Sequence, residues 1–359
     1  MRTYKVKATA LFPIHIGGGQ DQSLGPLDYV VKERGFYRID MENMLDRDAS
    51  FAAEFVKLVD ANRIMDLRRL IAGSFDPSIK ETWQWKAGTS KAFAKNYEMR
   101  LSDPRNQLLV QCLPRSGNKV YIPGSSIKGS IRTAVVDQLA EEKGYVNVAD
   151  RLQAENRKNV ASCVEALVLE AEFSGSGQIR PESDPFKGVK VSDAMLPENC
   201  TTIEEVMNVR KDGNALSLDM FVETVAPGTE FNLVIEIEDK AGMADVRRKI
   251  KIGDIIDNTA VFFQTELKNE ETAFYEGRDA QKWIDKAFAV NDEENADNKT
   301  VIRLGRFSHL ESMTFNHATL RKPRPPWDPK TKQPKKWGTT RNLVNGTIPL
   351  GALKLEIVK

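Results

Sequence analysis

The chain has 359 residues, of which 41% are hydrophobic and 29% are charged, and its formal net charge at pH 7 is +1. This length accommodates one elaborated domain or two fused domains with a sizeable core. A net charge so close to zero excludes a polycation that attracts nucleic acid over its whole surface. Any nucleic-acid role must therefore depend on local basic patches.

The sequence shows no signal for export or for a membrane. The first residues, MRTYKVKATALF, alternate polar and apolar side chains, which is typical of a strand and not of a signal peptide. No segment approaches the roughly 20 apolar residues of a membrane span. The cysteines, Cys112, Cys163 and Cys200, are far apart and form no CxxC pair, which predicts reduced thiols rather than a zinc site. We therefore expect a cytoplasmic protein with no membrane partner.

The first third of the chain predicts strands followed by helices. Residues 4–12 alternate with period two and predict a strand, which a glycine-rich loop, HIGGGQDQSLGPLD, follows directly. Short strands are expected at residues 29–31 and 35–39. Apolar residues at three- and four-residue spacing then predict an inserted helical subdomain over about residues 41–105.

The stretch YIPGSSIKGSIRTAVV, residues 121–136, predicts a helix whose first turn carries cations in place of the usual acids. We expect strands at 107–113 and 119–122, then a helix to about residue 142, with Ser125 or Ser126 as its N-cap. Lys128 and Arg132 lie one turn apart near the free amides of the helix start, so the tip predicts a phosphate cradle. The alternative is an ordinary helix with solvated cations on its exposed side.

The remaining elements suggest an α+β fold. Strands are expected at 165–173, 188–193, 216–225 and 230–238, the last two as a hairpin, and helices near 149–156 and over 243–289. Strands again close the chain, in VIRLGR and in GTIPLGALKLEIV. The pattern predicts a ferredoxin-like core with a helical insertion, the topology of the common RNA-binding sheet. We divide the chain into residues 1–240, the palm of this core, and 241–359, which complete the fold.

Three further segments are candidate RNA contacts. Gly17, Gly18 and Gly19 permit close approach of a backbone, although a flexible turn is the simpler reading. Arg303 and Arg306 flank Gly305 after a predicted strand. Residues 320–341 are rich in lysine and arginine and include Trp327 and Trp337, which suits phosphate contact with base stacking. The alternative for this last segment is a disordered, charged, proline-rich loop.

These motifs together resemble the RAMP superfamily of CRISPR-associated RNA-binding proteins. The resemblance depends on HIGGG, IPGSSIKGSIRT, DPFKGVKVSDA at residues 184–194, and the late loop RLGR. The length and the closing PLGALKLEI are similar to the capping subunit of type III-A Csm complexes. The resemblance implies that guide RNA contacts the following residues: Gly17, Gly18, Gly19, Ser125, Ser126, Lys128, Arg132, Arg303, Arg306 and, at the loop, His15.

The resemblance also implies a role and partners. Such a subunit caps the filament at the 3′ part of the crRNA and supports crRNA maturation and antiviral defence. Its partners would be crRNA, target RNA, a neighbouring RAMP backbone subunit, other subunits of the complex and trimming nucleases. We expect neither a cofactor nor a metal, and no enzymatic activity.

Two alternatives of another class remain at this point. Asp28, in LGPLDYVV, matches the position of the aspartate with which RAMP backbone subunits cut target RNA, which would make the chain a metal-dependent endoribonuclease. Only Asp21 and Asp40 are candidates for a second acid. His15 matches the histidine that guide-processing RAMP nucleases use as a general base, although no partner group is visible in the sequence.

Overall fold

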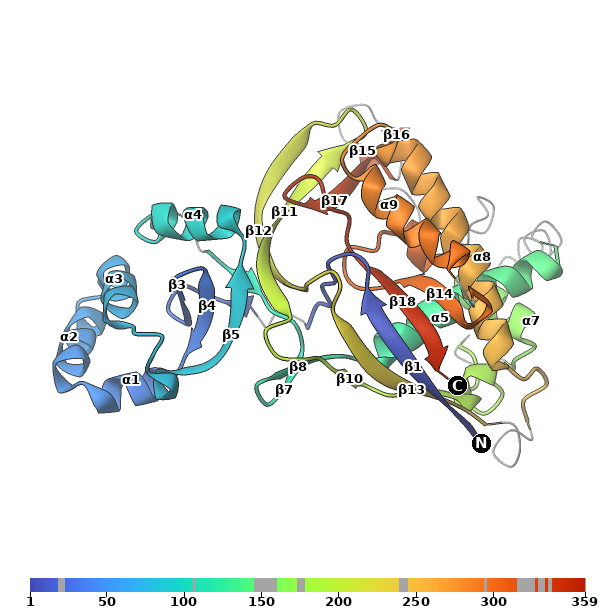
Figure 1. Ribbon diagram of the computed structural model, residues 1–359, viewed down its shortest axis with the longest axis horizontal. Coiled ribbons are helices and arrows are strands. Elements are labelled where there is room, and N and C mark those ends of the chain that lie inside the picture. Colours follow the sequence, from blue (N-terminus) through green and yellow to red (C-terminus); the bar gives the residue numbers. More distant parts are fainter. Residues whose placement is uncertain are drawn as a thin grey trace.

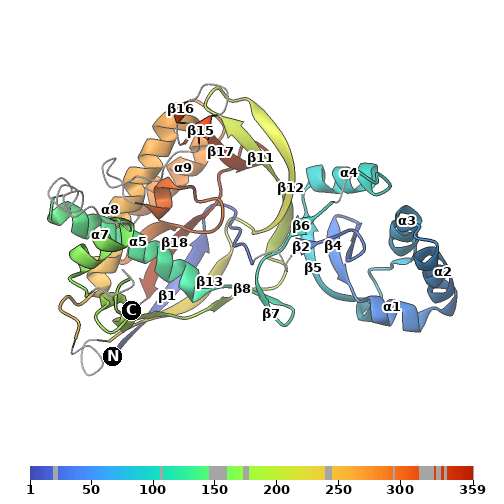
Figure 2. The same cartoon turned by 180° about the vertical axis from the view of Figure 1, so that it is seen from behind.

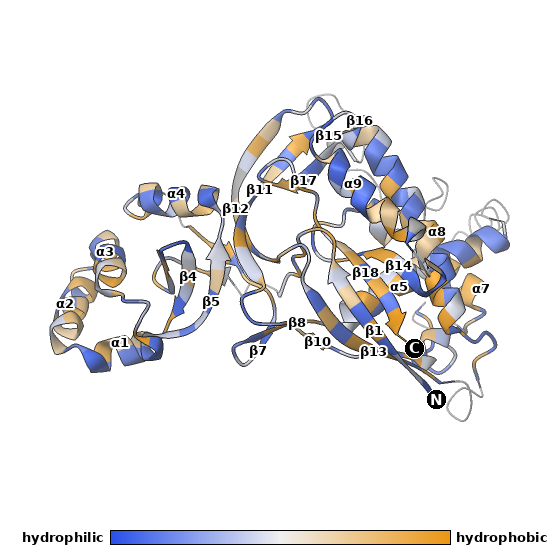
Figure 3. Cartoon of the chain, in the orientation of Figure 1, coloured by the Kyte–Doolittle hydropathy of each residue, from blue (hydrophilic) through white to orange (hydrophobic). Residues whose placement is uncertain are grey.

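The computed structural model describes residues 1–18, 23–105, 108–144, 160–172, 178–238, 245–293, 296–314, 327–328, 333–334 and 338–358. The molecule is elongated, with a main body of sheets and helices and an appendage at one end that contains α1–α4 (Figure 1). Hydrophobic residues gather along the strands and inward helix faces of the main body, whereas the outer face of α9 is largely hydrophilic (Figure 3).

A five-stranded antiparallel sheet forms the centre of the main body. Its strands, in spatial order, are β14 (Lys299–Arg303), β18 (Ala352–Val358), β1 (Arg2–Ala10), β13 (Glu230–Ile237) and β9 (Val189–Val191). Strand β1 is central because Val6 lies opposite Leu233 of β13 on one side and Ile357 of β18 on the other. Both ends of the described chain therefore meet in this sheet (Figure 1).

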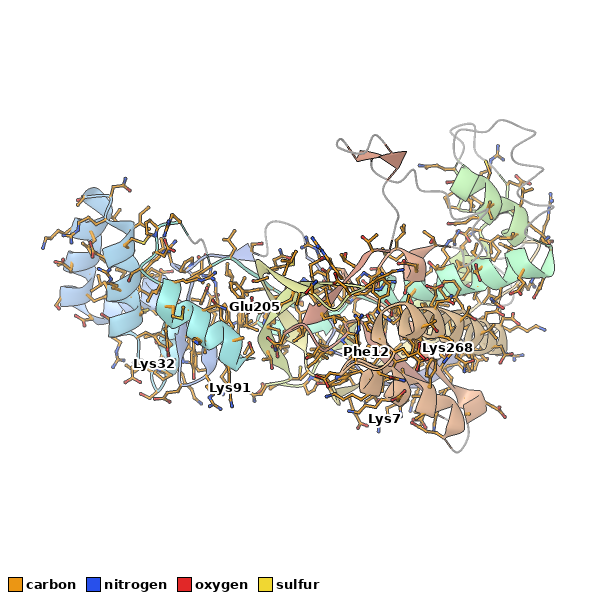
Figure 4. All side chains as sticks on the ribbon, turned by 90° about the horizontal axis from the view of Figure 1, so that it is seen from above. Lys7, Phe12, Lys32, Lys91, Glu205 and Lys268 are labelled. Atoms are coloured by element: carbon orange, nitrogen blue, oxygen red, sulfur yellow. The ribbon has the colours of Figure 1, made fainter. Side chains whose placement is uncertain are left out.

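Helices cover this sheet and bury two cores with it. They are α5 (Gly124–Glu142), α7 (Val160–Leu169), α8 (Ile252–Glu270) and α9 (Gln281–Phe288), with a π-helical turn at Glu271–Tyr275 after α8. Helix α5 crosses the body from its start beside β8 (Figure 2). Its stripe Ile127, Ile131, Val135 and Leu139 is buried, which confirms the predicted apolar face. Phe12, labelled in Figure 4, is buried in a second core with α8 and α9 residues.

A second, mixed sheet connects the body to the appendage. Its strands, in order, are β2 (Ser23–Leu24), β6 (Val110–Gln111), β12 (Ala215–Val225), β11 (Thr201–Arg210), β5 (Trp83–Thr89), β4 (Gly35–Ile39) and β3 (Tyr29–Lys32), and β17 (Thr340–Val344) also pairs with β11. A small sheet lies beside it, with β10 (Ala194–Met195), β8 (Lys119–Ile122) and β7 (Arg115–Ser116). Strands β15 (Trp327–Asp328) and β16 (Gln333–Pro334) pair with each other.

The appendage packs its helices around strands β3–β5. The helices are α1 (Met41–Arg47), α2 (Ala49–Asp60), α3 (Ile64–Ser74) and α4 (Lys91–Arg100). The described residues also form short 3-10 turns, at Lys80–Thr82 in the appendage and at Pro185–Gly188, Ala289–Asp292, Ala296–Asn298 and Glu311–Met313 elsewhere. Glu205, labelled in Figure 4, joins the appendage to β11, since Asn96 of α4 donates to its carboxylate at 3.4 Å.

Three predicted elements are wrong. The helical insertion over about residues 41–105 also contains a strand, Trp83–Thr89, which pairs with β4. Residues 165–169 belong to α7 rather than to a strand, because this segment packs as a helix against α5 and their side chains are almost all apolar. Strands β12 and β13 do not form a hairpin. They lie in different sheets because the turn after Val225 bonds back to Ala10, which leads β13 along β1. The predicted helix near 149–156 lies outside the described residues.

Candidate nucleic-acid interface

The tip of α5 carries an anion supplied by the protein itself. Pro123, at the N-cap, has extended backbone and provides no side-chain cap, so the prediction of Ser125 or Ser126 as the cap is wrong. Instead, the Gly124 amide donates to Asp193 Oδ1 at 2.7 Å. Only glycine fits at residue 124, because a Cβ there would lie 2.2 Å from Val191 O. The Asp193 carboxylate therefore satisfies the helix start and complements its dipole, while Ser125 is exposed.

Arg132 is held by two carboxylates, and its predicted RNA contact stays a prediction. Its Nη1 donates to both oxygens of Asp184 at 3.0 and 2.9 Å. Its Nε and Nη2 donate to Glu165 Oε2 at 3.1 and 2.9 Å. Burial alone would lower the pKa of Arg132, but Asp184 and Glu165 outweigh it and raise the pKa. Because both edges of the guanidinium are engaged, Arg132 fixes α5 to α7 and to the turn Pro185–Gly188.

Lys128 remains available at the edge of a shallow cavity. It is half-buried and has no ion-pair partner in the part of the chain that the structure describes. The cavity has a volume of about 310 Å³, and its lining includes Arg132, Asp184 and Phe186. Burial lowers the pKa of Lys128, and Arg132 acts in the same direction, whereas Asp184 opposes them. A phosphate beside Lys128 would meet an ammonium that forms no ion pair with the described residues.

The glycine loop and the late loop lie against each other. The Arg306 amide donates to His15 O at 3.0 Å, and Arg306 Nη1 donates to Gln111 Oε1. Gly305 has φ of +94°, and a Cβ there would lie 2.3 Å from His15 O, so this close approach requires glycine. Gly17 and Arg306 are exposed side by side, since a Cβ on Gly17 would lie 3.7 Å from Arg306 Cδ. The structure thus brings together two segments that the sequence separates.

Gly18 is exposed beside Gly17, whereas Gly19 and Trp337 lie outside the described residues. Trp327 begins the short strand β15.

His15 contradicts the prediction of an RNA contact or general base. Only 1% of the residue is exposed, and its Nδ1 lies 2.8 Å from Glu223 O. Its ring packs on Phe307, with the ring centroids 5.7 Å apart. Burial lowers the pKa of His15, against the opposing effect of Glu223. The imidazole therefore supports the glycine loop from within, out of reach of a ribose hydroxyl.

Arg303 also contradicts its prediction, because its side chain is only 1% exposed. Its Nη1 donates to Glu270 Oε2 at 2.5 Å and its Nη2 to Leu350 O at 2.9 Å. Glu270 accepts a further bond from Arg341 Nε at 2.7 Å. Burial alone would raise the pKa of Glu270, but Arg303 and Arg341 lower it to about 2. Arg303 therefore joins β14 to α8 and stays away from solvent.

The two exposed parts of the interface share one rigid support. Ser130 Oγ of α5 donates to Arg303 O at 2.7 Å, which attaches the helix to the end of β14 just before the late loop. Ile16, Ile127 and Leu304 pack in the same core. The tip of α5 and the Gly17–Arg306 surface are thus fixed relative to each other.

Asp28 has structural partners. Its Oδ1 accepts from Arg38 Nη1 at 3.0 Å, and its Oδ2 accepts from the Gly25 amide at 2.8 Å. These bonds close the turn before β3. Within the described ranges, no group of three or more His, Cys, Asp or Glu side chains is placed to hold a metal ion.

Sequence reasoning missed the acids that determine which cations are free. Asp184 and Asp193 both come from DPFKGVKVSDA, so the motif that accompanies the helix signature supplies its internal counter-charges. The signal was the presence of two aspartates in that motif. Glu270 and Glu165 carried no comparable signal.

Comparison with known proteins identifies the class. The sequence profile of the RAMP superfamily matches residues 7–338, and the chain belongs to this superfamily. The chain is a Csm5-like member of it. It is 28% identical over 251 residues to the "CRISPR system Cms protein Csm5" of Methanocaldococcus jannaschii, covering 66% of this chain and 53% of that protein. The Streptococcus thermophilus protein of the same name is 24% identical over 250 residues, covering 67% of this chain and 66% of that protein.

Solved structures share the fold over nearly the whole chain. A chain in the cryo-EM structure of a type III-A Csm–crRNA–target RNA ternary complex superposes with a TM-score of 0.71 at 18% identity, covering 99% of this chain and 100% of that one. The crystal structure of T. onnurineus Csm5 gives a TM-score of 0.63 at 18% identity, covering 97% and 99%. In the described part of the chain, no helix has the length and apolar composition of a membrane span.

Proposed function

We propose that this chain is a crRNA-binding subunit of a type III-A CRISPR effector complex. It caps the filament at the 3′ part of the crRNA and thereby supports crRNA maturation and antiviral defence. The observation that carries the proposal is the fold match, over 99% of this chain, to a chain in a Csm–crRNA–target RNA complex. Its partners would be crRNA, target RNA, a neighbouring RAMP backbone subunit and trimming nucleases.

The exposed groups of the interface support binding that is independent of sequence. Lys128 and Arg306 have no carboxylate partner among the described residues, and Gly17 and Gly18 expose backbone beside Arg306. Cations and open backbone suit phosphate and ribose, which carry no sequence information. This matches the needs of a subunit that must hold guides of unrelated sequence.

We further infer that the five-stranded sheet is a ferredoxin-like core. Its elements follow the order β1, α5, β9, β13, α8 and β18, and the four strands lie in the spatial order β18, β1, β13, β9. This is the arrangement of a βαββαβ unit, with β14 added at the edge. The exposed tip of α5 then lies at the start of the first crossover helix of that unit.

The proposal assigns no nuclease activity and no cofactor to this subunit. The carboxylate of Asp28 is occupied by Arg38 and the Gly25 amide, and His15 is enclosed by protein. Both side chains have structural roles, since Asp28 forms hydrogen bonds in the turn before β3 and His15 packs beneath the glycine loop.

The test is the double variant Lys128→Ala with Arg306→Ala in the full chain. Binding of fluorescent single-stranded guide RNAs of unrelated sequence is measured over a series of salt concentrations. Two lost phosphate contacts should lower the log–log salt slope by about 1.4, twice the ~0.7 of one contact, equally for every sequence. The matched control is Lys57→Ala with Arg105→Ala, which removes two exposed appendage cations. An unchanged slope in the first variant would contradict the proposal.

A further inference from the structure

A second cavity lies in the fork between β5 and the chain that leads into β11. It has a volume of about 540 Å³ and is bounded by β5, by the hairpin β7–β8 and by residues 195–201. Strand β11 runs parallel to β5, and the described pairing between them begins at Gly88, opposite Thr202. Before that pair the two chains form separate walls of the cavity, which we call the β5 groove.

The β5 groove follows the edge of β5 rather than one of its faces. Four consecutive residues, 83–86, line it, although successive side chains of a strand point to opposite faces. Trp85 stacks on Phe36, with the ring centroids 5.6 Å apart, whereas Trp83 packs edge-to-face on Tyr37, also at 5.6 Å. Phe36 and Tyr37 are neighbours in β4 and point to opposite faces, so the two tryptophans do as well. A cavity that touches both of them and the residues between them therefore faces the edge of the strand.

The backbone of Lys86 points into the β5 groove. The Ser90 amide donates to Ile203 O of β11 at 3.0 Å, and the Thr89 amide donates away from β11, to the turn between β3 and β4. Backbone groups alternate in direction along a strand, and pairing with β4 is regular over residues 85–88, so the N–H and C=O of Lys86 point to the side of β11. Within the described ranges, Lys86 has no backbone partner on that side. The strand thus offers one donor and one acceptor to a further strand.

The charges of the β5 groove favour an acidic partner. Lys86 and Lys119 line it, both are exposed, and neither forms an ion pair with the described residues. Arg115 also lines it but is neutralised by Glu223, whose Oε1 accepts from its Nη2 at 2.5 Å. Glu198 is the acid in the lining. The two lysines outweigh this single carboxylate, so the groove complements a segment that carries acids.

Lys86 also makes the open edge selective. A lysine on an edge strand discourages pairing with an arbitrary strand, which protects the protein from aggregation. An acid on the incoming strand removes this barrier, because opposite charges on neighbouring strands attract and like charges repel. The edge therefore discriminates between an acidic strand and a basic one.

We propose that the β5 groove is a docking site for an extended, acidic segment of another protein chain. The segment adds to β5 as a short strand, accepts from the N–H of Lys86 and donates to its C=O. Its acidic side chains lie beside Lys86 and Lys119. This inference goes beyond the proposed function, because the contact joins protein backbones and leaves Lys128 and Arg306 free for RNA.

The test uses the full chain and a synthetic peptide of about six residues that alternates valine with glutamate, the length of a typical strand. Amide hydrogen exchange, read by mass spectrometry, should slow in the segment that contains β5 when the peptide is added, because the Lys86 amide gains an acceptor. The same peptide with N-methylated backbone keeps its charges and loses its donors, so it should give no protection. A peptide of valine and lysine should give none either.

Charge reversal in the β5 groove measures the selectivity. Lys86→Glu and Lys119→Glu should each weaken binding of the fluorescent valine–glutamate peptide about fivefold. The matched control is Lys91→Glu, which makes the same change at an exposed position of α4 outside the groove and should bind like the unmodified chain.

Two results would overturn the inference. One is that the valine–glutamate peptide leaves exchange in β5 unchanged, or that its N-methylated form protects β5 equally. The other is that single-stranded RNA protects β5 and loses this effect in Lys119→Glu, which would assign the groove to RNA. The proposed function is decided separately, by the salt slope of Lys128→Ala with Arg306→Ala, so either idea can fail while the other stands.

Discussion

Replacing Arg132 by alanine separates a structural role from an RNA-binding role. The guanidinium joins Asp184 and Glu165, and the three side chains are 22%, 21% and 36% exposed. Removing it leaves two carboxylates without their partner in a partly desolvated site. Hydrogen bonds to charged groups contribute about 1.5–3 kcal/mol each when buried. Since solvent screens this site in part, we expect the free energy of unfolding to fall by about 2 kcal/mol in total.

The assay measures stability and RNA binding on the same samples. With a urea m-value of about 3 kcal/mol/M, a loss of about 2 kcal/mol shifts the unfolding midpoint by about 0.7 M. At low urea, where Arg132→Ala remains folded, the salt slope of guide binding should equal that of the unmodified chain. Lys128→Ala is the matched control and should behave in the opposite way, with an unchanged midpoint and a slope lower by about 0.7.

One result would exclude a purely structural role for Arg132. If Arg132→Ala lowers the slope by about 0.7 and leaves the urea midpoint unchanged, the guanidinium contacts phosphate and its carboxylate pairs are incidental. A fall in both quantities would mean that Arg132 exchanges partners when RNA binds.

Two further predictions concern groups that the proposed function leaves without an RNA role. Glu270→Gln should destabilise the fold by about 3 kcal/mol at pH 7, because the carboxylate whose pKa is held at about 2 loses the charge that Arg303 and Arg341 require. A carboxylate with a depressed pKa in the folded state stabilises the fold above its unfolded pKa, near 4.5, and this stabilisation is lost as the pH falls. In urea titrations, the difference in unfolding free energy between Glu270→Gln and the unmodified chain should therefore shrink below about pH 4.5, to about half by pH 3. A difference that stays constant with pH would contradict this. Asp28→Asn should leave the target-RNA cleavage products of the assembled complex unchanged. It should lower the free energy of unfolding by less than about 1 kcal/mol, because the Asp28 carboxylate is 42% exposed. Loss of cleavage would make Asp28 catalytic.

Local pattern predicted two short strands and the helix of the main candidate RNA-binding motif. Strands at Tyr29–Lys32 and Gly35–Ile39 and the helix after Pro123 appear where the periodicity placed them. In the helix, Ile127, Ile131 and Val135 recur on one face, so the period is readable. Both faces of the two strands are buried, because Tyr29 and Phe36 lie in one core and Val30 and Ile39 in another. Helix α7 failed this test because its sequence, VASCVEALVL, is apolar nearly all round. Such a segment has no readable period, and a strand fits it as well as a helix does.

Pairing between distant strands could not be predicted. Strand β12 pairs with β11, which the sequence did not indicate, and β13 pairs with β1 across more than 200 residues. A tight turn such as Pro227–Gly228 predicts a change of direction but not which sheet the next strand joins. The choice depends on long-range packing, for which local propensity carries no information.

The sequence indicated the basic residues of the candidate site but not which of them are free of an acidic partner. Lys128, Arg132, Arg303 and Arg306 look alike in the sequence. The structure divides them, because Arg132 and Arg303 form ion pairs with acids 33 or more residues away, whereas Lys128 and Arg306 form none with the residues that the structure describes. Which arginine is buried with a partner is a property of the fold. The resemblance of the motifs could therefore indicate the candidate RNA-binding surface without indicating which of its side chains can contact RNA.

The internal acids also restrict the path of an RNA chain in the proposed function. Asp193 occupies the first amide of α5 and is exposed, so it repels a phosphate placed on the helix axis. Among the described residues, the cations without a carboxylate partner lie beside the tip, at Lys128, and across Ser130 at the Gly17–Arg306 surface. A backbone that follows the positive potential must pass along the flank of α5 rather than over its end. Reversing the charge at Asp193 would open the shorter path and should increase affinity for RNA, even though the helix loses its cap.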